Sequence, residues 1–308
     1  MSNAELPRRA AEAILRRVAP SATLTEVIRR TGGELSGVHE LRCAEPVIVK
    51  VYPEEWDYRQ DKEVHVYRTL ARHGVGPVPE VLHVERAGGL LDEAFTVLSR
   101  IPGVPMSEVS AGMDEAEHRG LYRGIGEFLA AVHDIGQDGY GEITTEVVDP
   151  APANTPYMTR RFARSLALFD GDPELRRGVE SYVAERVGLF ASCAAPVLCH
   201  NDLHEGNVLV AEGPNGWAVT GFVDVENAIA ADPLIDIAKT DYYSILGVEA
   251  KLTGLLEGYG PLPDDWRERV AVYSLHHALE LWCFHSIVGN TRFLPDIAGG
   301  VRRRLARP

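Results

Sequence analysis

Cysteine is scarce in this 308-residue sequence, and long apolar runs are missing from it. The four cysteines, Cys43, Cys193, Cys199 and Cys283, contain no CxxC pair. Thiols so few and so widely spaced argue against a disulfide framework and favour a reducing, cytoplasmic location. No stretch approaches the roughly 18 apolar residues of a membrane-spanning helix, so no membrane association is expected. The N-terminal segment predicts an amphipathic helix instead of a signal peptide.

Basic residues are also few relative to acidic ones. The sequence has 31 Lys and Arg against 45 Asp and Glu, a net charge of −14. A protein this acidic repels phosphate backbones, which argues against nucleic acid as a partner. The charge suits a cationic small molecule, although solubility alone explains most of it. Aromatic residues make up 7% of the chain and do not cluster, which disfavours the aromatic cage that choline would require.

The pattern of apolar residues divides the chain into two regions. Residues 24 to 52 alternate short β-like runs with turn signals, a helix follows at 58 to 74, and two further strands precede residue 102. Beyond that point helical periodicity dominates, and only residues 197 to 224 break it. The sequence therefore predicts an α+β fold with a small antiparallel-sheet lobe at residues 1–100. A larger, mainly helical lobe with an inserted β-hairpin is expected at residues 101–308.

A dense group of polar residues, "VLCHNDLHEGNVLV" at 197 to 210, separates two of the predicted strands. The strands at 207 to 212 and 217 to 223 flank a "GPNG" turn, so the hairpin brings Asn207 beside Asp224. Neighbouring strands lie ~5 Å apart, and Asp202 sits on the loop just before the same edge. These three oxygen donors are the hard ligands that suit Mg²⁺ held jointly with substrate phosphates.

This group has two alternative interpretations. His200 and His204 are four residues apart, as in the zinc motif H-E-x-x-H, but the acid is misplaced and the segment is a loop. Turn and capping roles explain one or two Asn and Asp residues, but not three that converge from both ends of a hairpin.

Three motifs in order, "HNDLHEGN", "GFVDVENA" and "ADPLIDIAK", resemble the aminoglycoside phosphotransferase family of the protein-kinase-like superfold. The family pattern is HGD-x4-N, an apolar strand that ends in Asp, and DPxxDLA. Because "VIVKVY" resembles the nucleotide-lysine strand and "TVLSRIPG" the hinge, the resemblance spans roughly residues 25 to 290. Asn201 stands where the family has Gly, and Asn is the next most tolerant residue for an unusual backbone conformation, so we expect the loop to be retained.

The resemblance implies a two-lobed kinase-like fold that transfers a phosphoryl group from ATP or GTP, with Mg²⁺, to an acceptor hydroxyl. Asp202 would accept or orient the hydroxyl proton, and Asn207 and Asp224 would hold the metal. Lys50 would contact the α- and β-phosphates, and Glu63 on the next helix would fix Lys50. An edge-facing, solvated Lys and an exposed helix Glu are the ordinary alternatives for these last two residues.

The resemblance also assigns softer roles. The Ser99 carbonyl and the Ile101 N–H would hold the nucleotide base at the hinge, and Ser36 and Gly37 would form the tip of a loop over the phosphates. An ordinary hairpin turn explains Ser36 and Gly37 nearly as well. The remaining residues are expected to brace or shape the site, namely His200, Asp236, Glu226, Asp232 and His133.

The acceptor implied by the resemblance is a small-molecule antibiotic, an aminoglycoside or similar, that the reaction inactivates. Its candidate contacts are Glu280, Trp282 and His285, although Trp282 also fits a core position. Metabolic kinases of the same fold, acting on homoserine, methylthioribose, a fructosamine or choline, are the first rival. The second is a catalytically silent nucleotide-binding regulator, against which the intact polar set argues. A monomer or homodimer is expected.

Overall fold

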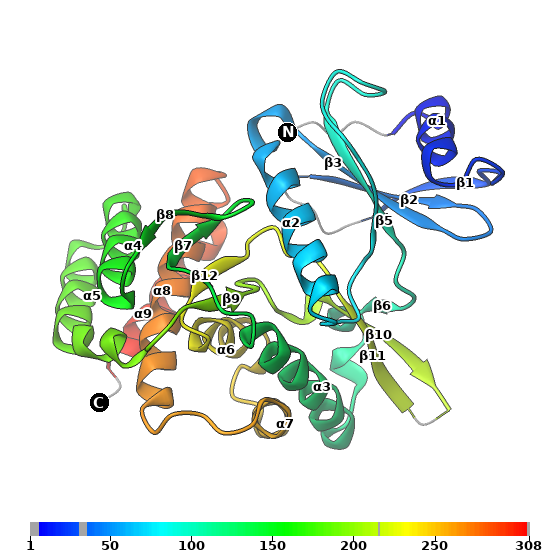
Figure 1. Ribbon diagram of the computed structural model, residues 1–308. Helices are drawn as coiled ribbons and strands as arrows, with labels where there is room; N and C mark the ends of the chain where they lie inside the picture. The colour runs from blue at the N-terminus through cyan, green and yellow to red at the C-terminus, as the bar shows by residue number, and fades with distance from the viewer. Residues whose placement is uncertain (1–5, 31–35, 215, 307–308) are drawn as a thin grey trace. The chain divides into compact units, whose positions relative to one another are not determined.

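A computed structural model describes residues 6–30, 36–214 and 216–306 (Figure 1). The chain forms two compact units, and each unit combines separate stretches of sequence. The first unit contains residues 1–121, 143–146 and 205–228, and the second contains 122–142, 147–204 and 229–308. The lobe boundary at residue 100 stays a prediction.

The first unit is built on a five-stranded antiparallel sheet with the strand order β1-β2-β3-β5-β4. Its helices and strands are α1 (Arg8–Val18), β1 (Glu26–Arg30), β2 (Gly37–Arg42), β3 (Val47–Tyr52), α2 (Tyr58–Arg72), β4 (Val81–Glu85), β5 (Ala94–Ser99), β6 (Val104–Pro105), the start of α3 (Glu115–His133), β10 (Val208–Gly213) and β11 (Gly216–Phe222), with short 3-10 turns at η1 (Glu54–Trp56), η2 (Met106–Glu108), η3 (Ser110–Gly112) and η5 (Glu205–Asn207).

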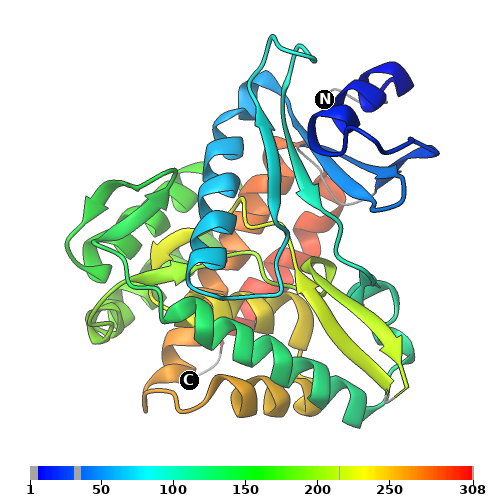
Figure 2. The ribbon, with the colours of Figure 1, turned by 45° about the vertical axis from the view of Figure 1, so that its right-hand side comes forward.

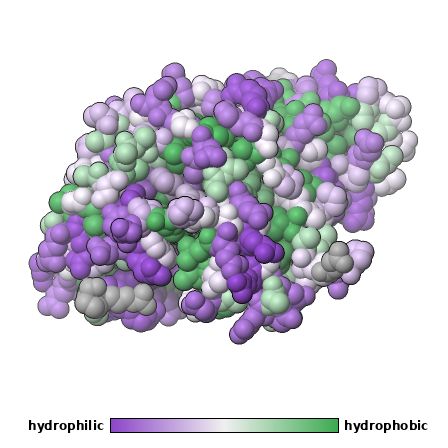
Figure 3. Space-filling model, turned by 60° about the horizontal axis from the view of Figure 1, so that its bottom comes forward, coloured by the Kyte–Doolittle hydropathy of each residue, from purple (hydrophilic) through white to green (hydrophobic). Residues whose placement is uncertain are grey.

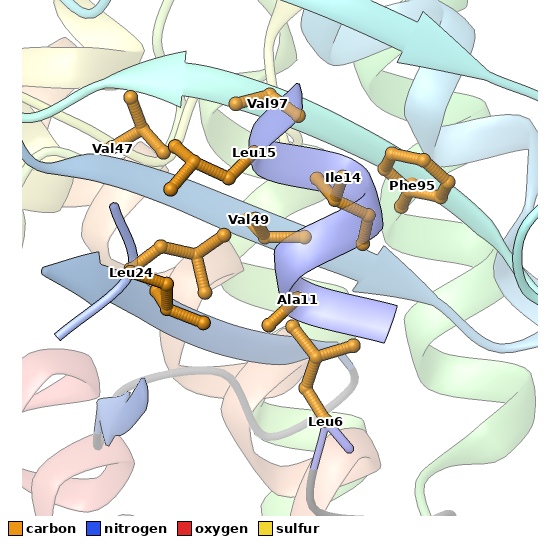
Figure 4. Packing of buried hydrophobic residues seen from close by; sticks show 10 residues of the cluster. Leu6, Ala11, Ile14, Leu15, Leu24, Val47, Val49, Phe95 and Val97 are labelled. Carbon is orange, nitrogen blue, oxygen red and sulfur yellow. The ribbon is translucent and has the colours of Figure 1, made fainter. Parts of the chain in front are cut away.

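The α1 helix covers one face of this sheet. Its apolar positions Ala11, Ile14 and Leu15 lie on one helical face and are fully buried, as the sequence periodicity predicts. They pack into a cluster with sheet residues such as Val49 and Val97 (Figure 4). This packing fixes the sheet on which the polar side chains of the other face are mounted.

Alternation along β3 divides its side chains between the two faces of the sheet. Val47 and Val49 join the apolar cluster below α1, whereas Lys50 lies on the opposite face because successive strand residues point in opposite directions. The α2 helix packs against the sheet, and the Gln60 amide donates hydrogen bonds to the Phe95 carbonyl at 2.8 Å and the Glu85 carbonyl at 3.0 Å. Buried backbone carbonyls at the sheet therefore gain partners from the helix.

A long hairpin in the first unit, formed by β10 and β11, lies between the predicted site residues Asn207 and Asp224 along the chain. Strands β10 and β11 pair antiparallel, as predicted, with Val208 opposite Phe222 (Figures 1 and 2). The β6 strand pairs with the other edge of β10 and completes a three-stranded sheet. The register places Asn207 beside Val223, whose N–H donates to the Asn207 carbonyl at 3.0 Å.

The second unit is mainly helical and also contains a four-stranded sheet of order β8-β7-β12-β9. Its helices and strands are the remainder of α3, β7 (Tyr140–Ile143), β8 (Val147–Ala151), α4 (Asn154–Leu168), α5 (Pro173–Arg186), β9 (Val197–Cys199), β12 (Ile229–Ala231), α6 (Leu234–Thr240), α7 (Glu249–Tyr259), α8 (Trp266–Ile287) and α9 (Leu294–Leu305), with 3-10 turns at η4 (Val187–Ser192) and η7 (Thr291–Phe293) and a π-helical turn at Asp241–Ile245.

The sheet of the second unit corrects one expectation. The sequence predicted that only residues 197 to 224 break the helical pattern beyond residue 102. Residues 140–143 and 147–151, however, also form strands, β7 and β8. These strands are four and five residues long, and β9 and β12 have three residues each. Such short strands show too few alternations to be recognised from their sequence.

Hydrophilic side chains are interspersed with apolar ones on the face drawn in Figure 3. In residues 6–30, 36–214 and 216–306, none of the helices combines the length and the hydrophobicity that a membrane crossing requires.

Candidate active site

Lys50 forms the centre of a buried charge cluster in the first unit. Its side chain is 7% exposed, and its Nζ lies 2.8 Å from Asp224 Oδ1, 2.7 Å from Glu226 Oε2 and 3.2 Å from Glu63 Oε1. Burial alone would lower the pKa of Lys50, but the carboxylates of Asp224, Glu63 and Glu226 outweigh burial and raise this pKa well above its usual value. The ammonium group is therefore charged at any physiological pH.

Glu63 projects from α2 into the same cluster. It contacts Lys50 and accepts a hydrogen bond from the Tyr52 hydroxyl, which lies two residues along β3 on the same face as Lys50. Burial raises the pKa of Glu63 to about 7, although the Lys50 charge opposes this rise. Three carboxylates around one ammonium group exceed what that single charge can stabilise, so the cluster holds an excess of negative charge.

A second cation reaches this cluster from the start of α2. Arg59 Nη1 lies 2.5 Å from Glu226 Oε1, and its guanidinium stacks over the Trp56 ring at 4.8 Å. Burial would raise the pKa of Glu226, but Lys50 and Arg59 lower it below its usual value. The sequence assigned no partner to Glu226, because its two cations lie more than 160 residues away along the chain.

Asn207 and Asp224 lie at one end of the β10–β11 hairpin. Asp224 has a φ of 65°, a left-handed conformation that is uncommon for residues other than glycine. Its backbone N–H donates to the Tyr67 hydroxyl at 2.9 Å, so a side chain of α2 holds this strained residue in place. The Asn207 amide and the Asp224 carboxylate offer the hard oxygen donors that a divalent cation prefers, so this donor set fits Mg²⁺.

These residues line one cavity of about 240 Å³ in the first unit. Its lining contains the charged residues Lys50, Glu63 and Asp224, together with Asn207 and residues 99–101. The apolar surfaces come from residues such as Ile48, Leu98 and Leu209. Apolar walls joined to a few convergent polar groups are typical of small-molecule sites. The cavity suits a ligand that combines an apolar part with a polar part within reach of Lys50 and of a cation held by the carboxylates.

Ser36 and Gly37 do not line this cavity within the described residues. Ser36 is buried, and Gly37 begins β2 opposite Val51. The residues on their N-terminal side, 31–35, lie outside the described part of the chain, so the predicted phosphate loop is only partly described.

Asp202 belongs to the second unit. Its Oδ1 lies 3.5 Å from Lys239 Nζ and 3.9 Å from His204 Nε2, and its side chain is 21% exposed. Asn201 has a φ of 59°, so the Asn that replaces the family glycine adopts the unusual backbone conformation that glycine would permit. Asp202 is thus a partly accessible carboxylate next to a lysine that the sequence did not single out.

A fully buried carboxylate, Asp236, holds the loop that carries Asp202. It accepts hydrogen bonds from the backbone N–H groups of His200 at 2.7 Å and Asn201 at 2.6 Å, and its Oδ2 lies 3.0 Å from His133 Nε2. Burial would raise the pKa of Asp236, but the hydrogen bond and the charge of His133 lower it below its usual value. Thr240 adds a hydrogen bond to the Leu203 carbonyl at 2.9 Å. The loop is therefore fixed from both sides by α6.

The remaining predicted contacts are distributed through the second unit. Asp232 is buried and accepts hydrogen bonds from Arg269 and from the Tyr273 hydroxyl, and Trp282 donates its indole N–H to Asp170 at 2.8 Å. Glu280 is a partly exposed residue of α8 and pairs with Arg161 at 2.5 Å. Lys239 and Arg161 were missed because their importance depends on tertiary contacts that no local sequence pattern reveals.

Known proteins were then compared with the chain. A model of the phosphotransferase enzyme family matches residues 14–271. The chain belongs to this family. This membership confirms the prediction of a phosphotransferase with a hydroxyl acceptor. A comparison with curated protein sequences found no match.

Solved structures of phosphotransferases share the fold of the chain. A thermostable mutant of aminoglycoside phosphotransferase APH(4)-Ia, in complex with ADP and hygromycin B, is similar with a TM-score of 0.67 and 16% identity over 96% of both chains. The GDP and kanamycin complex of APH(2″)-IIIa has a TM-score of 0.69 and 13% identity, covering 96% of this chain and 97% of its own. A protein from Thermobifida fusca, described as a fructosamine-3-kinase, has a TM-score of 0.66 and 18% identity, covering 96% of this chain and 98% of its own.

At these identities the structural likeness concerns the fold. It confirms the predicted kinase-like fold class of the family. The structural neighbours leave the acceptor open, because they include both aminoglycoside phosphotransferases and a protein described as a fructosamine-3-kinase.

Proposed function

We propose that this phosphotransferase moves the γ-phosphoryl group of ATP or GTP to a hydroxyl of a small molecule, with Asp202 as the residue that orients or deprotonates the hydroxyl. The observation that carries this proposal is the cavity of the first unit, where Lys50 contacts both Glu63 and Asp224. A lysine held by carboxylates beside an apolar slot is suited to contact nucleotide phosphates while the base occupies the slot.

Different residues of the chain would bind the base and the phosphates of the nucleotide. The Ser99 carbonyl and the Ile101 N–H would hold the base edge-on, and Lys50, kept in position by Glu63, would contact the α- and β-phosphates. Ser36 and Gly37 would contribute to the cover of the phosphates. Asn207 and Asp224 would hold Mg²⁺, which supplies charge neutralisation at the phosphate oxygens when bound.

In the proposed transfer, a bond forms between the acceptor oxygen and the γ-phosphorus as the bond to the β–γ bridging oxygen breaks. The acceptor proton passes to Asp202 or, through it, to solvent. Asp202 is suited to orient the acceptor hydroxyl, because its carboxylate is partly exposed and lies 3.5 Å from Lys239 Nζ. The hydrogen bonds that the Asp236 carboxylate accepts from the backbone N–H groups of His200 and Asn201 would keep Asp202 in a constant position during the transfer.

There are two candidates for the class of the acceptor. An antibiotic acceptor is supported by the structures of similar fold that contain hygromycin B or kanamycin. A metabolic acceptor, a sugar-like small molecule, is supported by the similar protein described as a fructosamine-3-kinase. We take the antibiotic reading as the first candidate and the metabolic kinase as the second. A cytoplasmic, monomeric or homodimeric enzyme is part of the same proposal.

The proposal is tested by measuring ADP or GDP release from the purified protein with Mg²⁺ across antibiotics, sugars, homoserine and methylthioribose. Acceptor-dependent release is expected with one class, and Asp202→Ala should lower kcat by about 10²- to 10⁴-fold, since general acid–base groups contribute this much. Nucleotide binding by the Asp202→Ala variant should stay within about twofold of the unchanged protein, since Asp202 is not proposed to contact the nucleotide.

The outcomes separate the components of the proposal. Nucleotide binding without any acceptor-dependent release would favour the silent regulator. Failure to bind either nucleotide in the presence of Mg²⁺ would contradict the assignment of the cavity, and Lys50→Met in parallel would show whether binding depends on the proposed lysine.

A further inference from the structure

Asp202 shares a compact charged cluster with Lys239 in the second unit. Lys239 Nζ lies 3.5 Å from Asp202 Oδ1, and the two side chains are 12% and 21% exposed. Both groups are thus largely shielded from water yet open to a ligand. Burial would lower the pKa of Lys239, but the charges around it, including that of Asp202, raise this pKa above its usual value, so Lys239 stays a cation.

The Lys239 ammonium group retains hydrogen-bonding capacity. In the described part of the chain, its contacts are Asp202 at 3.5 Å and the Tyr243 ring at 4.7 Å from the ring centroid. A charge-assisted hydrogen bond is shorter, about 2.7 to 2.9 Å, and an ammonium group offers three donors. One or more of these donors can therefore reach an oxygen of a bound molecule.

The second carboxylate of this region is matched by a second cation. Glu280 Oε1 lies 2.5 Å from Arg161 Nη2, and Arg161 is 13% exposed. The guanidinium is held in place by His276 Nε2 at 2.9 Å and by the Tyr157 hydroxyl at 2.8 Å. Burial lowers the pKa of His276, which leaves its Nε2 free to accept the Arg161 N–H. The partly buried carboxylates Asp202 and Glu280 thus each have a positive partner, and Arg161 is also shared with the exposed Glu142, whose Oε1 lies 3.1 Å from Arg161 Nη1.

Aromatic rings border the same cluster, which corrects the expectation that the aromatic residues of this chain do not cluster. The π-helical turn Asp241–Ile245 follows α6 directly and sets Tyr243 beside Lys239, with Tyr242 at a ring-centroid distance of 4.9 Å and His204 at 6.1 Å from Tyr243. The π-helix is rare in proteins, and the examples that occur are often found at functional sites. Half-buried Tyr and His rings offer apolar faces for a ring system and polar edges for its hydroxyl groups.

On these observations we infer that the acceptor is an uncharged, ring-bearing polyhydroxyl compound, of the glycoside or nucleoside type, and not a polycation. This inference rests on the proposed function and specifies its acceptor. Lys239 neutralises the charge of Asp202 and donates a hydrogen bond to an oxygen of the acceptor molecule. Arg161 neutralises the charge of Glu280. A polycation would meet Lys239 and Arg161 where it needs unpaired carboxylates.

The net charge of the whole chain, −14, does not contradict this inference. Long-range charge steers the approach of a ligand, whereas the cations within reach of the bound molecule decide its affinity. The charge of the surface and the charge of the site are therefore separate properties, and they differ in this protein.

The test measures kanamycin binding, by calorimetry at low and high salt, to the protein loaded with a non-hydrolysable nucleotide and Mg²⁺. The unchanged protein is expected to bind it with a Kd weaker than about 1 mM. Lys239→Glu removes the cation, exposes Asp202 and adds a carboxylate, so binding should strengthen by about tenfold or more and weaken with added salt.

Arg177→Glu is the matched control, because it changes the net charge by the same amount at an exposed site of α5. This variant should bind kanamycin as the unchanged protein does. Equal binding by the two variants would show that overall charge explains any gain and would overturn the inference. Lys239→Met, which removes the cation without adding charge, serves if Lys239→Glu fails to fold, and it should strengthen binding by a smaller factor.

The reaction provides an independent readout. Uncharged glycosides and nucleosides should be better acceptors than kanamycin by at least about tenfold in kcat/KM, and Lys239→Met should lower kcat/KM for the uncharged acceptor by a similar factor. Micromolar kanamycin binding or faster kanamycin turnover in the unchanged protein would overturn the inference while the proposed function stands. Failure to bind nucleotide would instead remove the proposed function.

Discussion

The two charged regions of the molecule differ in how their charges are balanced. Around Lys50, three carboxylates share one buried ammonium group and one arginine, so negative charge is in excess. Around Asp202, each of the two partly buried carboxylates faces its own cation, Lys239 or Arg161, and the third carboxylate, Glu142, which shares Arg161, is exposed and screened by water. An excess of carboxylate is suited to bind a divalent cation, and a balanced site is suited to an uncharged molecule. The two sites thus differ in the ligands they can accept.

The largest effect is expected from a substitution that removes the excess negative charge of the first region. Asp224→Ala should lower kcat/KM by about 10³-fold or more, because this variant loses a proposed metal ligand and, with it, part of the charge stabilisation of the phosphates. In the absence of Mg²⁺, nucleotide binding should be retained, since removing a carboxylate lowers the repulsion of the phosphates. Steady-state kinetics and nucleotide titrations with and without Mg²⁺ measure both effects.

Asp92→Ala is the control for this comparison, because Asp92 is an exposed residue of the same unit. It should behave as the unchanged protein in both assays. If Asp224→Ala retained more than about a tenth of the activity, the excess of carboxylate at Lys50 would have no role in metal binding.

The second prediction targets the balanced region through the residue that holds its loop. Asp236→Asn keeps the size of the side chain but places an amide N–H against the backbone N–H of His200 or Asn201. The loss of these buried hydrogen bonds should cost about 3 kcal/mol of stability and lower kcat by about 10²-fold. Urea unfolding and steady-state kinetics measure the two effects.

The pH dependence of this effect has a definite sign. Because the folded pKa of Asp236 lies below its ordinary value of 3.8, the stability it contributes is present above pH 3.8 and is lost as the pH falls through the folded pKa. The advantage of the unchanged protein over Asp236→Asn should therefore shrink as the pH is lowered below 3.8. An advantage that stays constant through that range would contradict the ionised state assigned to Asp236.

Asp232→Asn is the matched control in the same unit. Asp232 is also a buried carboxylate, but its partners are Arg269, Tyr273 and the Leu234 N–H. This variant should lose stability as Asp236→Asn does, with a smaller fall in kcat at temperatures where both are folded. Equal losses of kcat would show that the loop is not the route from Asp236 to activity.

Much of this arrangement could be predicted from sequence, and the reason lies in which residues are near one another along the chain. The Asn207–Asp224 proximity follows from one hairpin, and the β-branched run of β3 marks Lys50 as unusual. The family motifs predicted the fold class. Short strands such as β7 and β12 could not be recognised, because three or four residues carry no clear period.

One physical reason explains why the sequence did not reveal Arg59 and Lys239 as site residues. Arg59 reaches Glu226, and Lys239 reaches Asp202, only through tertiary contacts. Charged residues on helices usually face solvent, so nothing in the local pattern distinguishes these two from the others. The difference between an unbalanced and a balanced site therefore becomes visible only in the folded structure.

The smallest expected effect tests how firmly the first region holds Asp224, the proposed metal ligand. Tyr67→Phe removes the acceptor of the Asp224 N–H hydrogen bond, worth about 1 kcal/mol, while Asp224 stays in its strained conformation at a φ of 65°. Loosening Asp224 should raise the apparent KM for Mg²⁺ by about fivefold and leave the acceptor KM nearly unchanged. Tyr140→Phe loses a comparable hydrogen bond, to the Cys193 carbonyl, in the second unit. If both variants changed the Mg²⁺ dependence equally, general destabilisation would explain the effect, whereas a change confined to Tyr67→Phe would show that α2 helps to hold the metal ligand in the unbalanced site.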